Sequence, residues 1–182
     1  MMERDWIKNV WIVCAGAMLV ASCRTVDPVN AARVAASPRD GARAEAVALL
    51  EQVARHLCEQ DRGALEALLV TEDEYRNVVL PGSVPPGEPP AQMPAEKVEF
   101  FTRLHRTKST YALAALLPAC AVGGLTFKRA EVPDKLEQRA GYALIREPRL
   151  VFADAQGSEV VLDPGVVVYF DGKAKILSYH SD

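Results

Sequence analysis

Six prolines lie within residues 81–94, and no other feature of the chain limits its fold so strongly. Proline lacks a backbone N–H and fixes φ, so such a dense run can form neither an α-helix nor a central β-strand. The segment therefore predicts an extended surface connector. Apolar residues recur at helical spacing on both sides of this connector, and residues after 124 are rich in strand-forming types. The chain is thus expected to form helices first and strands second.

The longest run of helical spacing follows Ser37 and Pro38. Serine is a favoured N-cap and proline is favoured at the first helical position, so a helix is predicted to begin here and to run to about Gln60. Its apolar residues recur every three or four positions, as expected for the buried face of an amphipathic helix. They are Ala46, Val47, Leu50, Val53, Ala54, Leu57 and Cys58.

Further helical segments are predicted on both sides of the connector. A short helix is expected around residues 65–69, and residues 71–74 have the capping-box pattern that opens another helical turn. Residues 95–117 restore helical spacing, with a break allowed near Lys108-Ser109, and Pro118 and Gly123-Gly124 are expected to end the helical region.

The carboxyl-terminal third predicts an antiparallel sheet. Pro148 lies inside one strand-like segment and therefore demands a bulge or an edge position. Asp171-Gly172 is a strong signal for a two-residue hairpin turn. The strand-like segments are 125–132, 142–154, 158–162, 166–170 and 173–179.

The register of the last hairpin assigns its residues to two faces. A two-residue turn pairs Tyr169 with Ala174 and Val167 with Ile176, so these four side chains share one face. The opposite face carries two lysines. The first face is therefore predicted to pack against the helices.

Helices followed by an antiparallel sheet define an α+β domain. The element order over residues 42–179, with its closing hairpin, resembles the NTF2-like or cystatin-like cone fold, in which amino-terminal helices pack on a curved sheet. The resemblance implies a cavity between helices and sheet, which Tyr169, Val167 and Ile176 would line. Enzymes of this fold place a carboxylate in the cavity. The sequence places none beside Tyr169, so no catalytic residue is predicted.

The amino terminus resembles the signal peptide of bacterial lipoproteins. An uncharged apolar run over residues 10–21 is too short to span a bilayer comfortably. Residues 19–23 read LVASC, which resembles a lipobox: an aliphatic residue, two small residues and an invariant cysteine. The resemblance implies removal of residues 1–22, lipid on the Cys23 thiol and membrane anchoring through that lipid. A secretory signal with a coincidental cysteine and an uncleaved short anchor are the alternatives.

Residues 23–37 contain many alanines and predict a tether between the lipid and the domain, or else the frayed start of a helix. The folded domain is then expected over residues 38–182. Arg24, rather than aspartate, follows the lipobox cysteine, and the enterobacterial sorting pattern then implies the outer membrane rather than the inner one. We therefore expect a lipid-anchored protein of the bacterial cell envelope.

Cys58 and Cys120 are the cysteines that remain once Cys14 is removed with the signal peptide and Cys23 carries lipid. An even pair in an exported domain favours a disulfide. Antiparallel packing of the first and third helices would not obviously bring the two cysteines close enough to form a disulfide. Two small buried thiols are therefore an equal alternative.

Charge and motifs exclude several functions. A formal net charge of −3 disfavours nucleic acid and anionic lipid headgroups as partners. The sequence contains no Gly-rich phosphate loop, Cys-x-x-Cys, His-Glu-x-x-His or Gly-x-Ser-x-Gly, so we predict neither a cofactor nor a metal site. His56 is expected to pair with Glu59 on its helix. His105, among three cations, is expected on a solvated basic face.

These patterns favour a non-enzymatic binding or interaction module, with an envelope protein or a small hydrophobic ligand as its partner. The alternative is a small-molecule enzyme, isomerase-like or hydratase-like, that uses the cone pocket. A carboxylate within hydrogen-bonding reach of tyrosine or histidine in that pocket would favour the enzyme. A cavity filled by leucine, valine and phenylalanine would favour the module.

Overall fold

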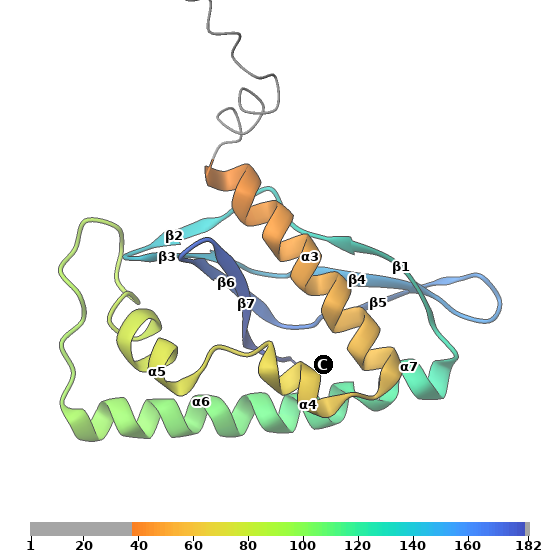
Figure 1. The fold of residues 1–182 in the computed structure, drawn as a ribbon, viewed down its shortest axis with the longest axis horizontal. Helices are drawn as coiled ribbons and strands as arrows, with labels where there is room; N and C mark the ends of the chain where they lie inside the picture. Colours follow the sequence, from red (N-terminus) through yellow and green to blue (C-terminus); the bar gives the residue numbers. More distant parts are fainter. Residues whose placement is uncertain (1–37, 181–182) are drawn as a thin grey trace, which may run out of the picture. The chain divides into compact units, whose positions relative to one another are not determined.

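In the computed structural model, which describes residues 38–180, helices precede strands along the chain (Figure 1). This order confirms the predicted α+β class. The expected signal peptide, the lipid-bearing Cys23 and the tether lie outside the described residues. None of the described helices is both long enough and apolar enough to cross a membrane.

The helices before the connector lie where the sequence predicts them. α3 spans Pro38–Glu59, and α4, Arg62–Ala67, follows with the Asp61 carboxylate as its N-cap. α5, Glu72–Glu74, starts with the predicted capping box, which is confirmed. The chain then continues directly into a π-helical turn, η1, Tyr75–Val79.

The helices after the connector differ from the prediction in two details. α6, Ala95–Leu116, is continuous, so the break allowed near Lys108 does not occur. Pro118 does not end the helical region but opens a short helix, α7, Pro118–Gly123, because the first turn of a helix needs no N–H donor there. The predicted end at Gly123-Gly124 is confirmed, because Gly124, with φ 56°, ends α7 in the left-handed conformation.

The strands form two antiparallel sheets rather than the single curved sheet expected from the sequence. One sheet has the order β1-β4-β5, made of Thr126–Glu131, Arg149–Ala153 and Glu159–Leu162. The other has the order β2-β3-β6-β7, made of Glu137–Arg139, Tyr142–Ile145, Val166–Phe170 and Lys173–Ser178.

Pro148 is the reason why one predicted strand became two. It lies between β3 and β4, where the chain leaves one sheet and enters the other, so it occupies neither a bulge nor an edge. Since proline cannot donate to a strand ladder, β4 begins only after Pro148, and β3 has already ended at Ile145. Strand β2 was not predicted, because its residues Glu137, Gln138 and Arg139 are all polar and show no apolar alternation.

The predicted hairpin between β6 and β7 is confirmed. Asp171 and Gly172 have φ values of 49° and 76°, as a type I′ turn requires. The two strands pair in the expected register. Ile176 is fully buried in the cluster that contains α3, and the Tyr169 hydroxyl lies 3.9 Å from where a Cβ on Gly41 of α3 would be. The predicted face therefore points toward α3.

Apolar side chains of α3 fill the space between this helix and the sheets. Leu50, Val53 and Leu57 are fully buried there together with Phe152 and Ile176. Burying one such side chain contributes about 1.5–3 kcal/mol to folding. A second cluster covers the other face of β3 and β6, and it consists of Val70, Val79, Tyr142, Leu144, Val166, Val168 and Phe170.

The connector over residues 81–94 contains neither helix nor strand, as predicted. Its first part is docked on the sheet: a Cβ added to Gly82 would lie 2.1 Å from the carbonyl oxygen of Ala140 and 2.8 Å from Cε1 of Tyr142. Only glycine allows this approach of two backbones. Residues 85–90 are exposed.

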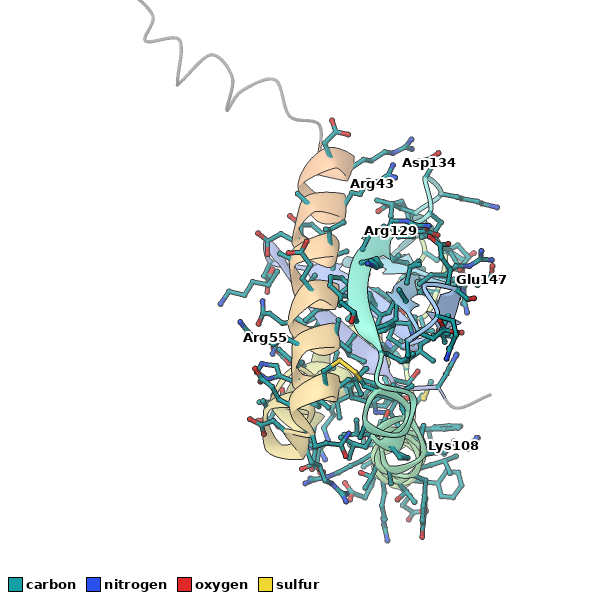
Figure 2. The ribbon with its side chains drawn as sticks, turned by 90° about the vertical axis from the view of Figure 1, so that its right-hand side faces the viewer. Arg43, Arg55, Lys108, Arg129, Asp134 and Glu147 are labelled. Carbon is teal, nitrogen blue, oxygen red and sulfur yellow. A yellow bond between two sulfur atoms is a disulfide. The ribbon has the colours of Figure 1, made fainter. Side chains whose placement is uncertain are left out.

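A disulfide joins Cys58, at the end of α3, to Cys120 in α7, with a Cα–Cα distance of 5.1 Å (Figure 2). Of the two alternatives that the sequence left open, the structure has the disulfide. The carboxyl end of α3 packs against α7, the short helix that follows α6, and this contact brings the two cysteines together. The Gln60 side chain also donates a hydrogen bond to the carbonyl of Leu117, beside the disulfide.

Candidate functional site

A groove with a volume of about 670 Å³ lies between the chain segment 66–75 and α6. Leu69, Val70 and the capping-box turn form part of one wall. The other wall is one face of α6, where polar side chains recur three or four positions apart. The groove therefore has one wall that mixes apolar and polar side chains and a second wall that is polar.

The capping box holds the first wall in place. The backbone N–H of Glu74 donates to Thr71 Oγ1 at 3.2 Å, and the Thr71 N–H donates to the Glu74 carboxylate at 2.8 Å. Lys175 of β7 donates to both oxygens of that carboxylate at 2.6 and 2.7 Å. Burial raises the pKa of Glu74, but the hydrogen bonds from Lys175 and Thr71 outweigh it and lower this pKa below its usual value. The turn is thereby fixed to the sheet.

His105 of α6 stacks on Tyr75 across the groove, with ring centroids 4.1 Å apart and an angle of 17° between the ring planes. Its Nε2 atom is hydrogen-bonded to the carbonyl oxygen of Leu177, the extra residue at the register shift between β6 and β7. Because a carbonyl only accepts, Nε2 carries the hydrogen and Nδ1 remains an acceptor. The predicted solvated basic face is therefore wrong for His105, whose ring is half-buried.

We expect the stability of the protein to fall as the pH drops below about 6.5, the ordinary pKa of histidine. Burial lowers the pKa of His105, and its bond to Leu177 only partly offsets this. The unfolded chain then binds the proton more readily than the folded chain, so stability is lost as the pH falls from about 6.5 toward the lowered pKa.

Urea denaturation of the wild-type protein and of His105→Gln across this pH range tests whether His105 causes the loss of stability. The glutamine variant keeps an N–H donor but cannot titrate, so its stability should depend less on pH between 6.5 and 5. Carboxylates with lowered pKa values, such as Glu74, change the stability of the protein only at more acidic pH, below about 4.5. Equal pH slopes for the two proteins would contradict the assignment.

The Ser109 hydroxyl is a buried polar group in the wall of the groove. The residue is 1% exposed, and its hydroxyl has no hydrogen-bond partner among the described residues. By contrast, the Thr102 hydroxyl on the same helix face donates to the Val98 carbonyl at 2.8 Å. A buried hydroxyl without a partner costs about 1–3 kcal/mol. Since Ser109 lines the groove, a ligand bound there could supply the missing partner.

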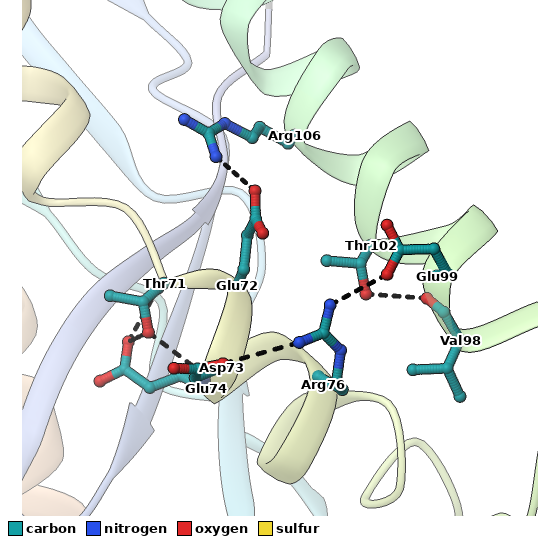
Figure 3. A network of polar contacts seen from close by, with 9 residues as sticks. All are labelled: Thr71, Glu72, Asp73, Glu74, Arg76, Val98, Glu99, Thr102 and Arg106. Atoms are coloured by element: carbon teal, nitrogen blue, oxygen red, sulfur yellow. Dashed lines mark hydrogen bonds and ion pairs between the residues drawn. The ribbon is translucent and has the colours of Figure 1, made fainter. Parts of the chain in front are cut away.

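Ion pairs connect the two walls (Figure 3). Arg106 of α6 pairs with Glu72 of α5. Arg76 of η1 pairs with Glu99 of α6 at 3.1 Å and with Asp73 at 3.6 Å. These side chains lie at the rim, partly in solvent, so each pair contributes at most about 1 kcal/mol. Their main effect is to keep η1 and α6 at a fixed separation.

The predicted pocket residues share one face of the β6–β7 hairpin, but they do not line one cavity. Val167 and Ile176 are fully buried among apolar side chains, whereas Tyr169 is half-buried and lines a smaller pocket of about 370 Å³ beside the start of α3. His56 pairs with Glu59 at 3.2 Å, as predicted. No sequence pattern marks Ser109, because a serine within a helix is usually exposed.

Among residues 38–180, no three histidine, cysteine or acidic side chains are grouped so that they could hold a metal ion. No protein-family model, curated protein or solved structure matches the chain. The fold and the site together therefore define a disulfide-linked α+β domain with a partly polar groove beside α6.

Proposed function

We propose that this protein is a lipid-anchored lipoprotein of the bacterial cell envelope whose folded domain is a non-enzymatic binding module. Lipid on Cys23 is the proposed attachment, and Arg24 favours the outer membrane. The groove beside α6 is the proposed ligand site. Ser109 carries this part of the proposal, because its buried hydroxyl lacks a partner that a ligand in the groove would supply.

The disulfide supports export from the cytoplasm. Disulfides form and persist in oxidising compartments such as the bacterial periplasm and the cell surface, and they are rare in the cytosol. Cys58 and Cys120 lie close enough to be bonded in the folded domain. Together with the lipobox-like residues 19–23, this pair favours a protein that is folded outside the inner membrane.

The groove suits a small uncharged ligand that is partly apolar. Leu69 and Val70 offer apolar contacts, while the Ser109 hydroxyl and His105 Nδ1 offer hydrogen-bonding groups. Because burial lowers the pKa of His105, its ring is neutral at pH 7 and does not attract anions. The charged rim is already self-paired, so it does not call for a charged ligand.

The enzyme alternative has less support than the binding module. The space between α3 and the sheets, where an NTF2-like fold would have its cavity, is filled by leucine, valine and phenylalanine side chains. No carboxylate among residues 38–180 is hydrogen-bonded to His105 or to Tyr169. The NTF2-like assignment itself is a proposal that rests on the element order and on the register of the last hairpin.

Replacing Ser109 by alanine is expected to leave the ligand-free protein equally stable or to stabilise it by about 1 kcal/mol, because alanine removes an unpartnered buried hydroxyl. The same change should weaken ligand retention. Native mass spectrometry of detergent-extracted wild-type protein should show an added mass that the Ser109→Ala protein lacks.

Ser83→Ala is the matched control, because the Ser83 hydroxyl already donates to the Leu80 carbonyl at 2.7 Å. This control should lose about 1 kcal/mol of stability and keep the added mass. A loss of about 1–3 kcal/mol in Ser109→Ala would mean that its hydroxyl is satisfied within the protein. That result would contradict the proposed ligand site.

The anchor is tested by growing cells with labelled fatty acid. The wild-type protein should incorporate the label, and Cys23→Ala should not, since only the thiol can carry the thioether-linked lipid. The variant should accumulate as precursor or in the soluble fraction. Label that persists in Cys23→Ala would overturn the proposed lipidation.

A further inference from the structure

α6 has an apolar face that points away from the groove and carries exposed aromatic side chains. Phe100 is 58% exposed, Phe101 39% and Tyr111 75%. Phe100, Leu104 and Tyr111 follow one another at spacings of four and seven, so they form one stripe along the helix. Large exposed aromatic residues on a single helix face mark an interaction surface rather than ordinary solvent exposure.

Nothing in the described chain covers this stripe. Figures 1 and 2 both place α6 at the margin of the folded unit, with no other element of residues 38–180 outside it. In Figure 2, where α6 is seen end-on, Lys108 projects sideways from the helix and not into the folded unit. Thr102 and Ser109 on the other side of the helix are buried, which confirms that the stripe is the outer face.

Cations flank the stripe. Lys97, Arg103 and Lys108 are exposed, and none of them forms an ion pair with another residue of the part that the structure describes. The nearby acid Glu99 is neutralised by Arg76, which leaves Glu96 as the unpaired acid of this helix. The net charge of −3 belongs to the chain as a whole, whereas the outer face of α6 is locally cationic.

We infer that the outer face of α6, defined by Phe100, Leu104, Tyr111 and the three flanking cations, docks on an anionic lipid surface. Aromatic side chains enter the headgroup region while lysine and arginine contact lipid phosphates and keep their stems along the apolar boundary. The outer face of α6 is convex, so it can dock on a deformable bilayer. An acidic helix of a partner protein would instead need a groove in which to bind. The cations would repel those of a second copy, which disfavours self-association.

The inference rests on the proposed lipid anchor, which would hold the domain near a bilayer. α3 rises about 33 Å over its 22 residues, and it starts at the end far from α6 (Figure 1). The chain of about 15 residues between Cys23 and α3 can reach at most about 50 Å. This reach is sufficient for the lipid and α6 to contact the same membrane. The lipid would then hold α6 close to the bilayer, and the cationic face would add to the attachment.

Tryptophan fluorescence tests the docking directly, because both natural tryptophans, Trp6 and Trp11, lie in the predicted signal peptide. In a Trp6→Phe, Trp11→Phe background, Phe100→Trp reports on the outer face of α6. Lys135→Trp, beside Asp134 at the opposite end of Figure 2, is the matched control. The full-length proteins are combined with vesicles of brominated phosphatidylcholine, with or without phosphatidylglycerol.

We expect strong quenching of the tryptophan at position 100 only when phosphatidylglycerol is present, and no quenching at position 135. Each cation should contribute roughly a fivefold gain in affinity for the anionic surface, so Lys97→Gln, Arg103→Gln and Lys108→Gln together should reduce docking on the order of 100-fold. Quenching that is absent, or equal with and without the anionic lipid, would overturn the inference. Circular dichroism confirms that the variants are folded.

The intact mass of the same samples separates this inference from the proposed anchor. A lipid-sized mass on Cys23 without anionic quenching at position 100 refutes the α6 docking alone. Anionic quenching without that mass refutes the anchor and leaves the docking in place, since vesicles then bind the unlipidated protein from solution.

Discussion

Replacing both Cys58 and Cys120 by alanine is expected to lower the free energy of unfolding by about 4 kcal/mol. The disulfide closes a loop with a sequence separation of 62, and the chain-entropy relation assigns this value to a loop of that length. Most of the effect comes from the unfolded chain, which gains freedom when the link is removed. Since small domains have only about 5–15 kcal/mol of stability, this is a large share.

Guanidinium denaturation of the double variant, with and without reductant, measures the effect. Wild-type protein in reductant should match the double variant, while Cys23→Ala should keep the wild-type value because Cys23 lies outside the loop. The link ties the end of α3 to α7 beside the hydrogen bond from Gln60 to Leu117. A change below about 1 kcal/mol would show that folding does not depend on the disulfide.

Local signals in the sequence predicted most elements correctly. The Thr71–Glu74 capping box and the Asp171-Gly172 turn each depend on a few adjacent residues, and both are confirmed. The apolar spacing that predicted α3 reflects one continuous packing surface against the sheets. Such features are encoded within a single element, so they do not require knowledge of what packs beside them.

Features that depend on distant residues could not be predicted. The passage from one sheet to the other at Pro148, and the all-polar strand β2, are decided by pairing across the sheets. The groove requires that Tyr75 and His105, which are far apart in sequence, stack on each other. Likewise, Ser109 became a candidate only because its surroundings bury it without giving it a partner.

Gly165→Ala is the second change for which we expect a large effect, a loss of about 3–5 kcal/mol. Gly165 has φ 110°, which side chains rarely adopt, and an added Cβ would lie 1.9 Å from the carbonyl oxygen of Ser178. Backbone strain contributes about 1–3 kcal/mol and the overpacking a further 1–3 kcal/mol. The clash cannot be relieved by a side-chain rotation, because the atoms it meets belong to the backbone of residues 178 and 179.

Gly157→Ala separates the clash from the strain, because Gly157 also has a positive φ, 85°, but no atom lies within 4 Å of its added Cβ. This control should lose only about 1–2 kcal/mol. Moving residue 179 also disturbs the groove, since the buried Tyr179 hydroxyl donates to the Leu65 carbonyl of α4 at 2.7 Å. Gly165→Ala, but not Gly157→Ala, should therefore lose the ligand mass in native spectra. Equal stabilities for the two variants in urea would show that β6 and the chain end are not packed as closely as this structure has them.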